Sequence, residues 1–272
     1  MYEVQVDIFS RQASKKARLL EQRPSRVWLG GILAGAYVGI GIILILVLGT
    51  EASPESRKLV MGATFAIALT LVIFAGADLF TGYTMYTTFG VLNNRMTLSQ
   101  AIYIAVVVWL ANLTGAVLLA GMYKLGGGLL TENADTALQT IAYKKMNATA
   151  VQLFFNGILC NWLVCLAIWM AARMNSDAAK CIAIFWCLFA FIASGYEHSV
   201  ANMTVFSLAL LGPEIEGISI QGAGFNLLWV TLGNVVSGVF FVGLSYWYLS
   251  RPLDVAECVS VDADTETTTK AR

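Results

Sequence analysis

The sequence predicts an all-α integral membrane protein with six transmembrane helices. Of its 272 residues 58% are hydrophobic and 12% are charged, whereas a soluble domain usually carries about 25% charged residues. A helix needs roughly 20 apolar residues to cross the hydrocarbon core of a bilayer. Apolar runs of that order recur six times, and His198 and Glu197 alone interrupt the fifth. The predicted spans are 27–50, 59–77, 96–123, 146–172, 181–211 and 217–250.

The segments outside the spans suggest an orientation. Residues 1–26 form a basic arm rather than a cleavable signal peptide, because the apolar run behind it is far longer than a signal core. With both termini on one side, that side carries twelve Lys and Arg residues against five on the other. This bias fits the positive-inside rule with cytoplasmic termini. The arm could lie on lipid or plug a pore, but simple anchoring is favoured. We expect the tail, 251–272, to be disordered because it lacks an apolar run.

The two halves of the chain resemble each other. Repeat one covers 27–123 and repeat two covers 146–250. The matching anchors, at offsets of 126, 119 and 122 residues, are Gly31 with Gly157, Asp78 with Glu197, and Asn112 with Asn234. Since each repeat has an odd number of spans, the second must run opposite to the first across the membrane. Inverted repeats place a substrate site near the midplane, between interrupted helices. The sequence therefore predicts two inverted repeats of three helices each.

The second and fifth spans are where we expect the interruptions. Each reaches a glycine, Gly76 or Gly195, then an acid, Asp78 or Glu197, and continues with polar residues. Irregular backbone at this depth is tolerated only where it lines a cavity or is buried in protein. We expect the two acids to support the broken helices by accepting N–H groups at the start of the second half-helices. Direct ion binding by these acids is the alternative.

The only histidine, His198, lies beside Glu197 in this apolar segment. An ionisable pair at bilayer depth is costly unless it faces a cavity or a partner. The position therefore indicates a conducting or relaying function, with a helix-bridging structural histidine as the alternative. One histidine and five cysteines without CxxC spacing do not make an ordinary metal site. We expect no metal, no cofactor, no enzymatic activity and no nucleic-acid partner.

Three segments resemble the signatures of the formate/nitrite transporter family. They are 75–82 (Ala-Gly-Ala-Asp-Leu-Phe-Thr-Gly), 157–167 and 194–203, and the similarity runs from about residue 11 to 250. The nitrite-channel branch is the nearest match within the family. The resemblance implies an aquaporin-like protomer with its own pore, a homopentamer in the bacterial inner membrane, and passage of small monovalent anions such as nitrite.

Carried onto matching positions, the resemblance also implies an apolar part of the substrate pathway. Leu69 would form the cytoplasmic constriction. Leu79 and Phe80 would lie on the loop that interrupts the second span, and Phe191 would add to the apolar lining from the fifth span.

The same resemblance implies polar positions along the pathway. Thr81 would hydrogen-bond the permeant species opposite His198. Lys145 and Asn161 would lie on the periplasmic approach, where a cation attracts anions, although the adjacent Lys144 leaves the register of that loop open. Asn234 would help to orient the central polar residues.

A histidine at the centre gives these roles physical sense. A bare anion crosses an apolar constriction only at a large cost in solvation, and histidine is the side chain whose ordinary pKa lies near neutrality. We hypothesise that His198 hydrogen-bonds or protonates the anion, so that a weak acid passes in its neutral form. The same scaffold could carry formate, hydrosulfide or acetate, and a neutral-solute channel for water, glycerol or ammonia is a further alternative.

Overall fold

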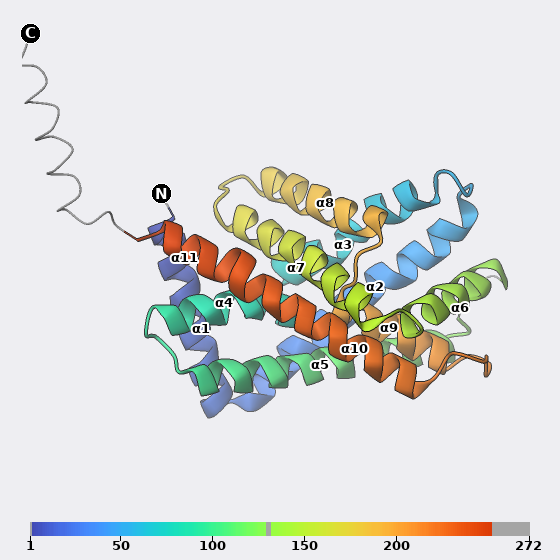
Figure 1. Cartoon of the computed structure of the whole chain (residues 1–272), viewed down its shortest axis with the longest axis horizontal. Helices are drawn as coiled ribbons and strands as arrows, with labels where there is room; N and C mark the ends of the chain where they lie inside the picture. The colour runs from blue at the N-terminus through green and yellow to red at the C-terminus, as the bar shows by residue number, and fades with distance from the viewer. Residues whose placement is uncertain (1, 129–131, 252–272) are drawn as a thin grey trace, which may run out of the picture.

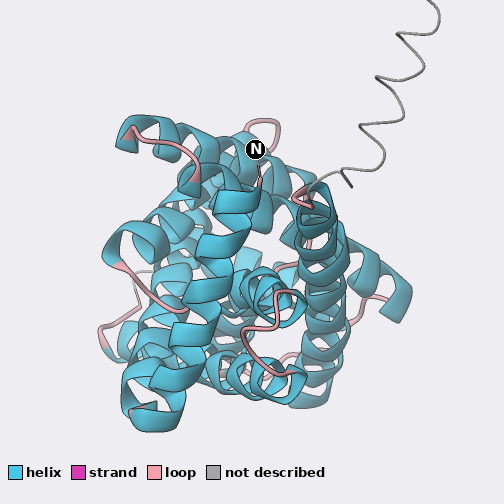
Figure 2. Cartoon of the chain, turned by 90° about the vertical axis from the view of Figure 1, so that its left-hand side faces the viewer, coloured by secondary structure: helices cyan, strands magenta, loops and turns pink. Residues whose placement is uncertain are grey.

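The computed structural model describes residues 2–128 and 132–251. The regular elements of this described part are all helices (Figure 2). The expected disordered tail lies, from residue 252 on, outside the described residues. In chain order the elements are α1 (Glu3–Gln22), α2 (Pro24–Glu51), α3 (Arg57–Ala75), α4 (Phe80–Leu92), α5 (Leu98–Leu125), α6 (Glu132–Met146), α7 (Ala150–Ala172), α8 (Asp177–Ser194), α9 (Ser199–Leu210), α10 (Ile220–Val236), the π-helical segment η1 (Ser237–Leu244) and α11 (Ser245–Leu249).

Six of the described helices are long and apolar enough to cross a membrane, which confirms the predicted number of spans. They are α2, α3, α5, α7, α8 and the continuous run Ile220–Leu249. That run joins α10, η1 and α11 into the long orange-to-red rod of Figure 1. Eight residues of this run, Ser237–Leu244, are π-helical, a feature that the periodicity of the sequence does not reveal.

Local sequence signals explain most helix ends. Pro24 opens α2, where its missing N–H costs nothing. Thr97 and Thr149 begin α5 and α7 with capping boxes. Gly76 and Gly195 end α3 and α8 with φ angles of 80° and 77°, a left-handed conformation that glycine adopts without strain.

Two short apolar helices follow these glycines. Four residues, 76–79, separate α3 from α4, and another four, 195–198, separate α8 from α9. Both α4 and α9 are buried along most of their length. The connections therefore bring Asp78 and Glu197, which precede α4 and α9, into the interior of the protein, where both acids are buried.

The amino-terminal arm is a helix that packs on the protein. Helix α1 crosses one end of the molecule, at the left of Figure 1 and facing the viewer in Figure 2. Phe9 stacks 6.1 Å from Phe89 of α4 and lies 5.9 Å from Trp169 of α7, measured between ring centroids. The hydroxyl of Ser10 donates to the carbonyl of Phe89 at 2.9 Å. The apolar face of α1 is thus buried, which leaves Arg11, Lys15 and Arg18 on its outer side.

A second helix, α6, occupies the segment before the fourth span that the sequence reading treated as a loop. Its charged and polar composition hides it from a search for apolar runs. Helix α6 precedes α7 as α1 precedes α2. The order of five helices, α1 to α5, therefore recurs as α6 to α10.

Candidate functional site

His198 lies at the start of α9 and caps it. Its Nδ1 accepts the backbone N–H of Ala201 at 3.1 Å. A neutral ring with Nδ1 occupied in this way carries its hydrogen on Nε2. Nε2 lies 3.2 Å from the hydroxyl oxygen of Thr81, at the start of α4. The ring is 4% exposed and stacks on Phe191 at a centroid distance of 6.0 Å.

Thr81 is held in place through its own carbonyl. That oxygen accepts from the hydroxyl of Thr84 at 2.6 Å, from Nδ2 of Asn161 at 3.4 Å, and from Sγ of Cys165 at 3.6 Å. These donors come from α4 and α7, so two elements fix the first turn of α4. The Thr81 hydroxyl, by contrast, has His198 as its hydrogen-bond partner among the described residues.

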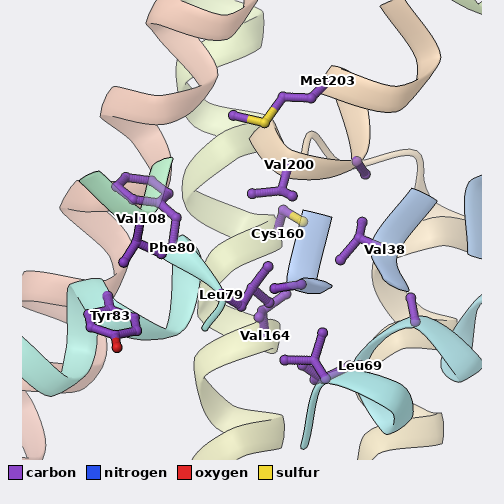
Figure 3. Close-up of a cluster of buried hydrophobic side chains, with 14 of the residues drawn as sticks. Val38, Leu69, Leu79, Phe80, Tyr83, Val108, Cys160, Val164, Val200 and Met203 are labelled. Carbon is purple, nitrogen blue, oxygen red and sulfur yellow. The ribbon is translucent and has the colours of Figure 1, made fainter. Parts of the chain in front are cut away.

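An apolar cavity adjoins the histidine. Its volume of about 10 Å³ is close to that needed for one water molecule. Figure 3 shows Leu69, Leu79, Val164 and Val38 converging, while Phe80 points to the other side, toward Val108. The cavity lining comprises Val38, Phe65, Ala68, Leu69, Leu79, Val164, Leu188, Phe191 and His198. Leu69, Leu79 and Phe191 therefore meet beside His198, whereas Phe80, the fourth apolar residue expected along the pathway, is not part of this lining.

Asp78 accepts two side-chain hydrogen bonds. Lys16 of α1 forms an ion pair with its Oδ1 at 2.7 Å, and the hydroxyl of Tyr83 donates to the same oxygen at 3.0 Å. The backbone N–H of Asp78 donates to the carbonyl of Gly30 at 3.0 Å. Asp78 is therefore engaged by a cation, and the four groups tie α1, α2 and α4 together.

Glu197 has the corresponding partners in the second half. Lys145, at the end of α6, forms an ion pair with its Oε1 at 2.9 Å, and Asn202 donates to Oε2 at 2.6 Å. The backbone N–H of Glu197 donates to the carbonyl of Asn156 at 3.3 Å. The adjacent Lys144 is exposed, so the structure assigns the acid's cation to Lys145.

Asparagines, and not the acids, accept the first N–H group of α4 and the first N–H group of α9. Asn112 of α5 accepts from the N–H of Phe80 at 2.9 Å and donates to the carbonyl of Asp78 at 2.9 Å. Asn234 of α10 accepts from the N–H of Ser199 at 3.1 Å and donates to the carbonyl of Glu197 at 3.2 Å. The expected acceptor role of Asp78 and Glu197 is wrong, because Asn112 and Asn234 accept these N–H groups. The carboxylates bind lysines and neighbouring side chains instead.

Asn161 lies beside the carbonyls of Thr81 and Asn234. It is fully buried, and its Nδ2 donates to the carbonyl of Asn234 at 2.7 Å and to the hydroxyl of Thr84 at 3.1 Å. Lys145, on the other hand, keeps one-fifth of its side chain exposed. Of the two residues expected on the periplasmic approach, Asn161 is thus the fully buried one and Lys145 the more exposed one.

No group of three or more potential metal ligands occurs within the described ranges, 2–128 and 132–251. The chemistry that this arrangement offers is hydrogen bonding at Thr81 and His198, next to an apolar cavity and between two Lys–acid pairs.

The comparison with known families agrees with this arrangement. The model of the family "Formate/nitrite transporter" matches residues 3–248. The chain belongs to the formate/nitrite transporter family. It is a transporter of this family and not an enzyme, and its six apolar helices make it a multi-pass membrane protein.

Three relatives show how close the match is. The chain is 55% identical to the nitrite transporter NirC of Escherichia coli (strain K12), over 87% of this chain and 88% of that protein. A solved structure described as an FNT family ion channel superposes with a TM-score of 0.87 at 51% identity, covering 90% of this chain and 98% of the other. A pentameric formate channel with formate bound superposes with a TM-score of 0.75 at 28% identity, covering 84% and 98%.

Two features of this formate/nitrite transporter site went unrecognised in the sequence. Asn112 served only as a repeat anchor, and its capping of α4 depends on contacts 32 and 34 residues away. Lys16 counted only as part of a basic arm. A signal was present, since Lys16 and Lys145 are separated by nearly the repeat offset and each binds the acid of its own half.

Proposed function

We propose that the chain passes nitrite across the bacterial inner membrane through a pore in each protomer of a homopentamer. The observation that carries the proposal is the contact of His198 Nε2 with Thr81 Oγ1 beside the cavity of Leu69, Leu79 and Phe191. Family membership and the 55% identity to a nitrite transporter support the cargo. The pentameric formate channel among its structural relatives supports the assembly.

The proposed architecture is a pair of inverted repeats with interrupted second and fifth transmembrane helices. The repeated order of five helices supports it, as do the matching bonds of Asn112 and Asn234. Under this proposal α3 with α4, and α8 with α9, each form one broken span. Their ends meet at the midplane, where Thr81 and His198 touch. The bias of Lys and Arg supports cytoplasmic termini.

In the proposed mechanism His198 donates a hydrogen bond and Thr81 completes the site. The neutral ring presents Nε2–H, and the Thr81 hydroxyl can turn its own hydrogen toward an anion oxygen. These two donors would replace part of the water that nitrite loses. The proton that converts nitrite into the neutral weak acid comes from the aqueous solution and not from His198, and this neutral species passes the leucines. The Lys145–Glu197 and Lys16–Asp78 pairs would place one cation on each side of this centre.

Flux measurements in proteoliposomes test this function. Nitrite, formate and hydrosulfide uptake is measured at two pH values for the unchanged protein, for His198→Phe, and for Trp186→Phe as a matched aromatic control exposed on α8. We expect nitrite uptake by the unchanged protein and by Trp186→Phe, and its loss in His198→Phe with assembly intact. Unchanged nitrite flux in His198→Phe would remove the histidine from the mechanism.

Formate is the second candidate cargo, because a relative that covers 84% of this chain holds formate. The same assay decides between the two. A higher uptake rate for formate than for nitrite at equal concentration would reassign the cargo without changing the site.

A further inference from the structure

We propose that an apolar groove beside the start of α2 binds an anionic phospholipid. The groove lies outside the central site, where the end of α1, the start of α2 and the start of α5 come together at the lower left of Figure 1. Its volume is about 450 Å³, which is within the usual range for small-molecule sites. Trp28, Leu29, Ile32, Tyr103, Val107 and Leu20 contribute to its walls.

The composition of the walls matches the boundary between hydrocarbon and headgroups. Trp28 and Tyr103 are 36% and 59% exposed, so the groove is open toward the surroundings of the protein. Tryptophan and tyrosine concentrate where acyl chains meet headgroups. Ile32 and Val107 lie farther along α2 and α5, where acyl chains would run. An acyl chain therefore fits the groove, with its headgroup toward the start of α2.

Two cationic side chains without an ion-pair partner among the described residues lie at the start of α2. Arg23 and Arg26 are exposed, and neither has an ion pair or a side-chain hydrogen bond in the described part of the chain. Glu21, the acid nearest to them in sequence, already accepts from Gln100 at 2.8 Å. Long arginine side chains can extend along apolar surface to reach a headgroup phosphate, and basic sites between transmembrane helices select anionic lipids. This charge favours a phospholipid with a net negative headgroup over a zwitterionic one.

Quenching of Trp28 by brominated lipid tests the proposal. The purified oligomer is mixed with brominated phosphatidylglycerol or brominated phosphatidylcholine, and the signal of Trp28 is obtained as the difference between the unchanged protein and Trp28→Phe. We expect phosphatidylglycerol to quench Trp28 at a lower mole fraction than phosphatidylcholine. The ratio of the two mole fractions measures the selectivity, and it should fall roughly fivefold for each arginine removed. This factor corresponds to the usual binding free energy of one basic residue near an anionic surface.

The variants are Arg23→Gln and Arg26→Gln, alone and together. The control is Lys58→Gln, an exposed cation at the start of α3. Circular dichroism and size-exclusion chromatography show that each variant is folded and assembled. Equal quenching by the two lipids would overturn the proposal, as would selectivity that survives the double substitution. Quenching by neither lipid would also overturn it.

Discussion

A histidine caps helix α9, where serine, threonine, aspartate or asparagine is the usual choice. The cap fixes the ring, because Nδ1 must stay in line with the N–H of Ala201. A doubly protonated ring would turn an N–H toward that N–H and lose the cap. The geometry therefore favours a neutral His198 that donates through Nε2. Of the two roles that the sequence suggested for His198, hydrogen bonding and protonation of the anion, this geometry favours hydrogen bonding.

Thr81 supplies the second hydrogen-bonding group of the proposed site. Replacing it by valine keeps the shape and removes the hydroxyl. We expect Thr81→Val to lower nitrite flux by about tenfold, a typical consequence of losing one hydrogen bond to a charged group, and less than His198→Phe does. Thr81→Ser, which retains the hydroxyl, should stay close to the unchanged protein in the same proteoliposome assay. Equal fluxes in the valine and serine variants would show that the Thr81 hydroxyl does not contribute to nitrite transport.

Lys145 and Lys144 form a natural pair of test and control. Lys145→Met would leave the buried carboxylate of Glu197 without its cation, and breaking a buried ion pair typically costs about 3 kcal/mol or more. We expect a lower apparent Tm in detergent together with reduced nitrite flux. Lys144→Met, at an exposed position, should change neither. If both variants behave alike, the pair with Glu197 has no special part in the fold or in transport.

At the scale of elements, α4 is positioned by a close contact with η1. A methyl group at Gly238 would overlap the side chain of Thr84 and come within 3.2 Å of Nδ2 of Asn161. Both of those side chains donate to the carbonyl of Thr81. Because Gly238 has no side chain, the π-helical segment can pack closely against Thr84 and Asn161 without displacing them.

Gly238→Ala should therefore reduce nitrite flux although it lies outside the cavity lining. The added methyl displaces Thr84, and the first turn of α4 loses a donor that holds Thr81. Gly224→Ala on α10 is the matched control, because nothing lies within 4 Å of its added methyl, and alanine favours a helix over glycine by about 1 kcal/mol. Flux and apparent Tm are measured for both. A normal flux in Gly238→Ala would mean that α4 tolerates the shift.

At the scale of the whole molecule, the sequence predicts the spans better than their connections. The six apolar runs are enough to predict the six spans, because the length and hydropathy of a segment can be read from that segment alone. Helix α6 is polar and was missed for the same reason. The side chains of Phe80 and Leu79 point to different sides, and this difference depends on the residue at which α4 begins. Asn112, more than thirty residues away, fixes that residue by accepting the N–H of Phe80. Long-range hydrogen bonds of this kind leave no periodic trace in the chain.

The central residues could be found from sequence because a charge in an apolar run is conspicuous. His198, Asp78 and Glu197 stand out in this way, and the resemblance to a family added Thr81, Leu69 and Phe191. The sequence did not reveal which atoms bind which. Asn161 is a neutral side chain, so its place beside Thr84 and Asn234 follows only from the packing of α7 against α4 and α10.

The proposed passage of nitrite as its neutral acid predicts a specific selectivity for the whole protein. Nitrite and nitrate are similar in size, but nitrite is the anion of a weak acid and nitrate that of a strong one. Two hydrogen-bond donors offset only part of the cost of moving an anion into apolar surroundings. A pore that passes the neutral acid should therefore admit nitrite and carry little nitrate. Nitrite uptake should rise as external pH falls from about 8 to about 5, because the protonated fraction of nitrite grows.

Protein-free liposomes, measured in parallel, give the leak of the free acid through lipid, and this leak is subtracted. Electrical recording on the same preparation should detect little current with nitrite. A large nitrite current, nitrate uptake equal to that of nitrite, or uptake indifferent to pH would each mean that the bare anion crosses the apolar constriction.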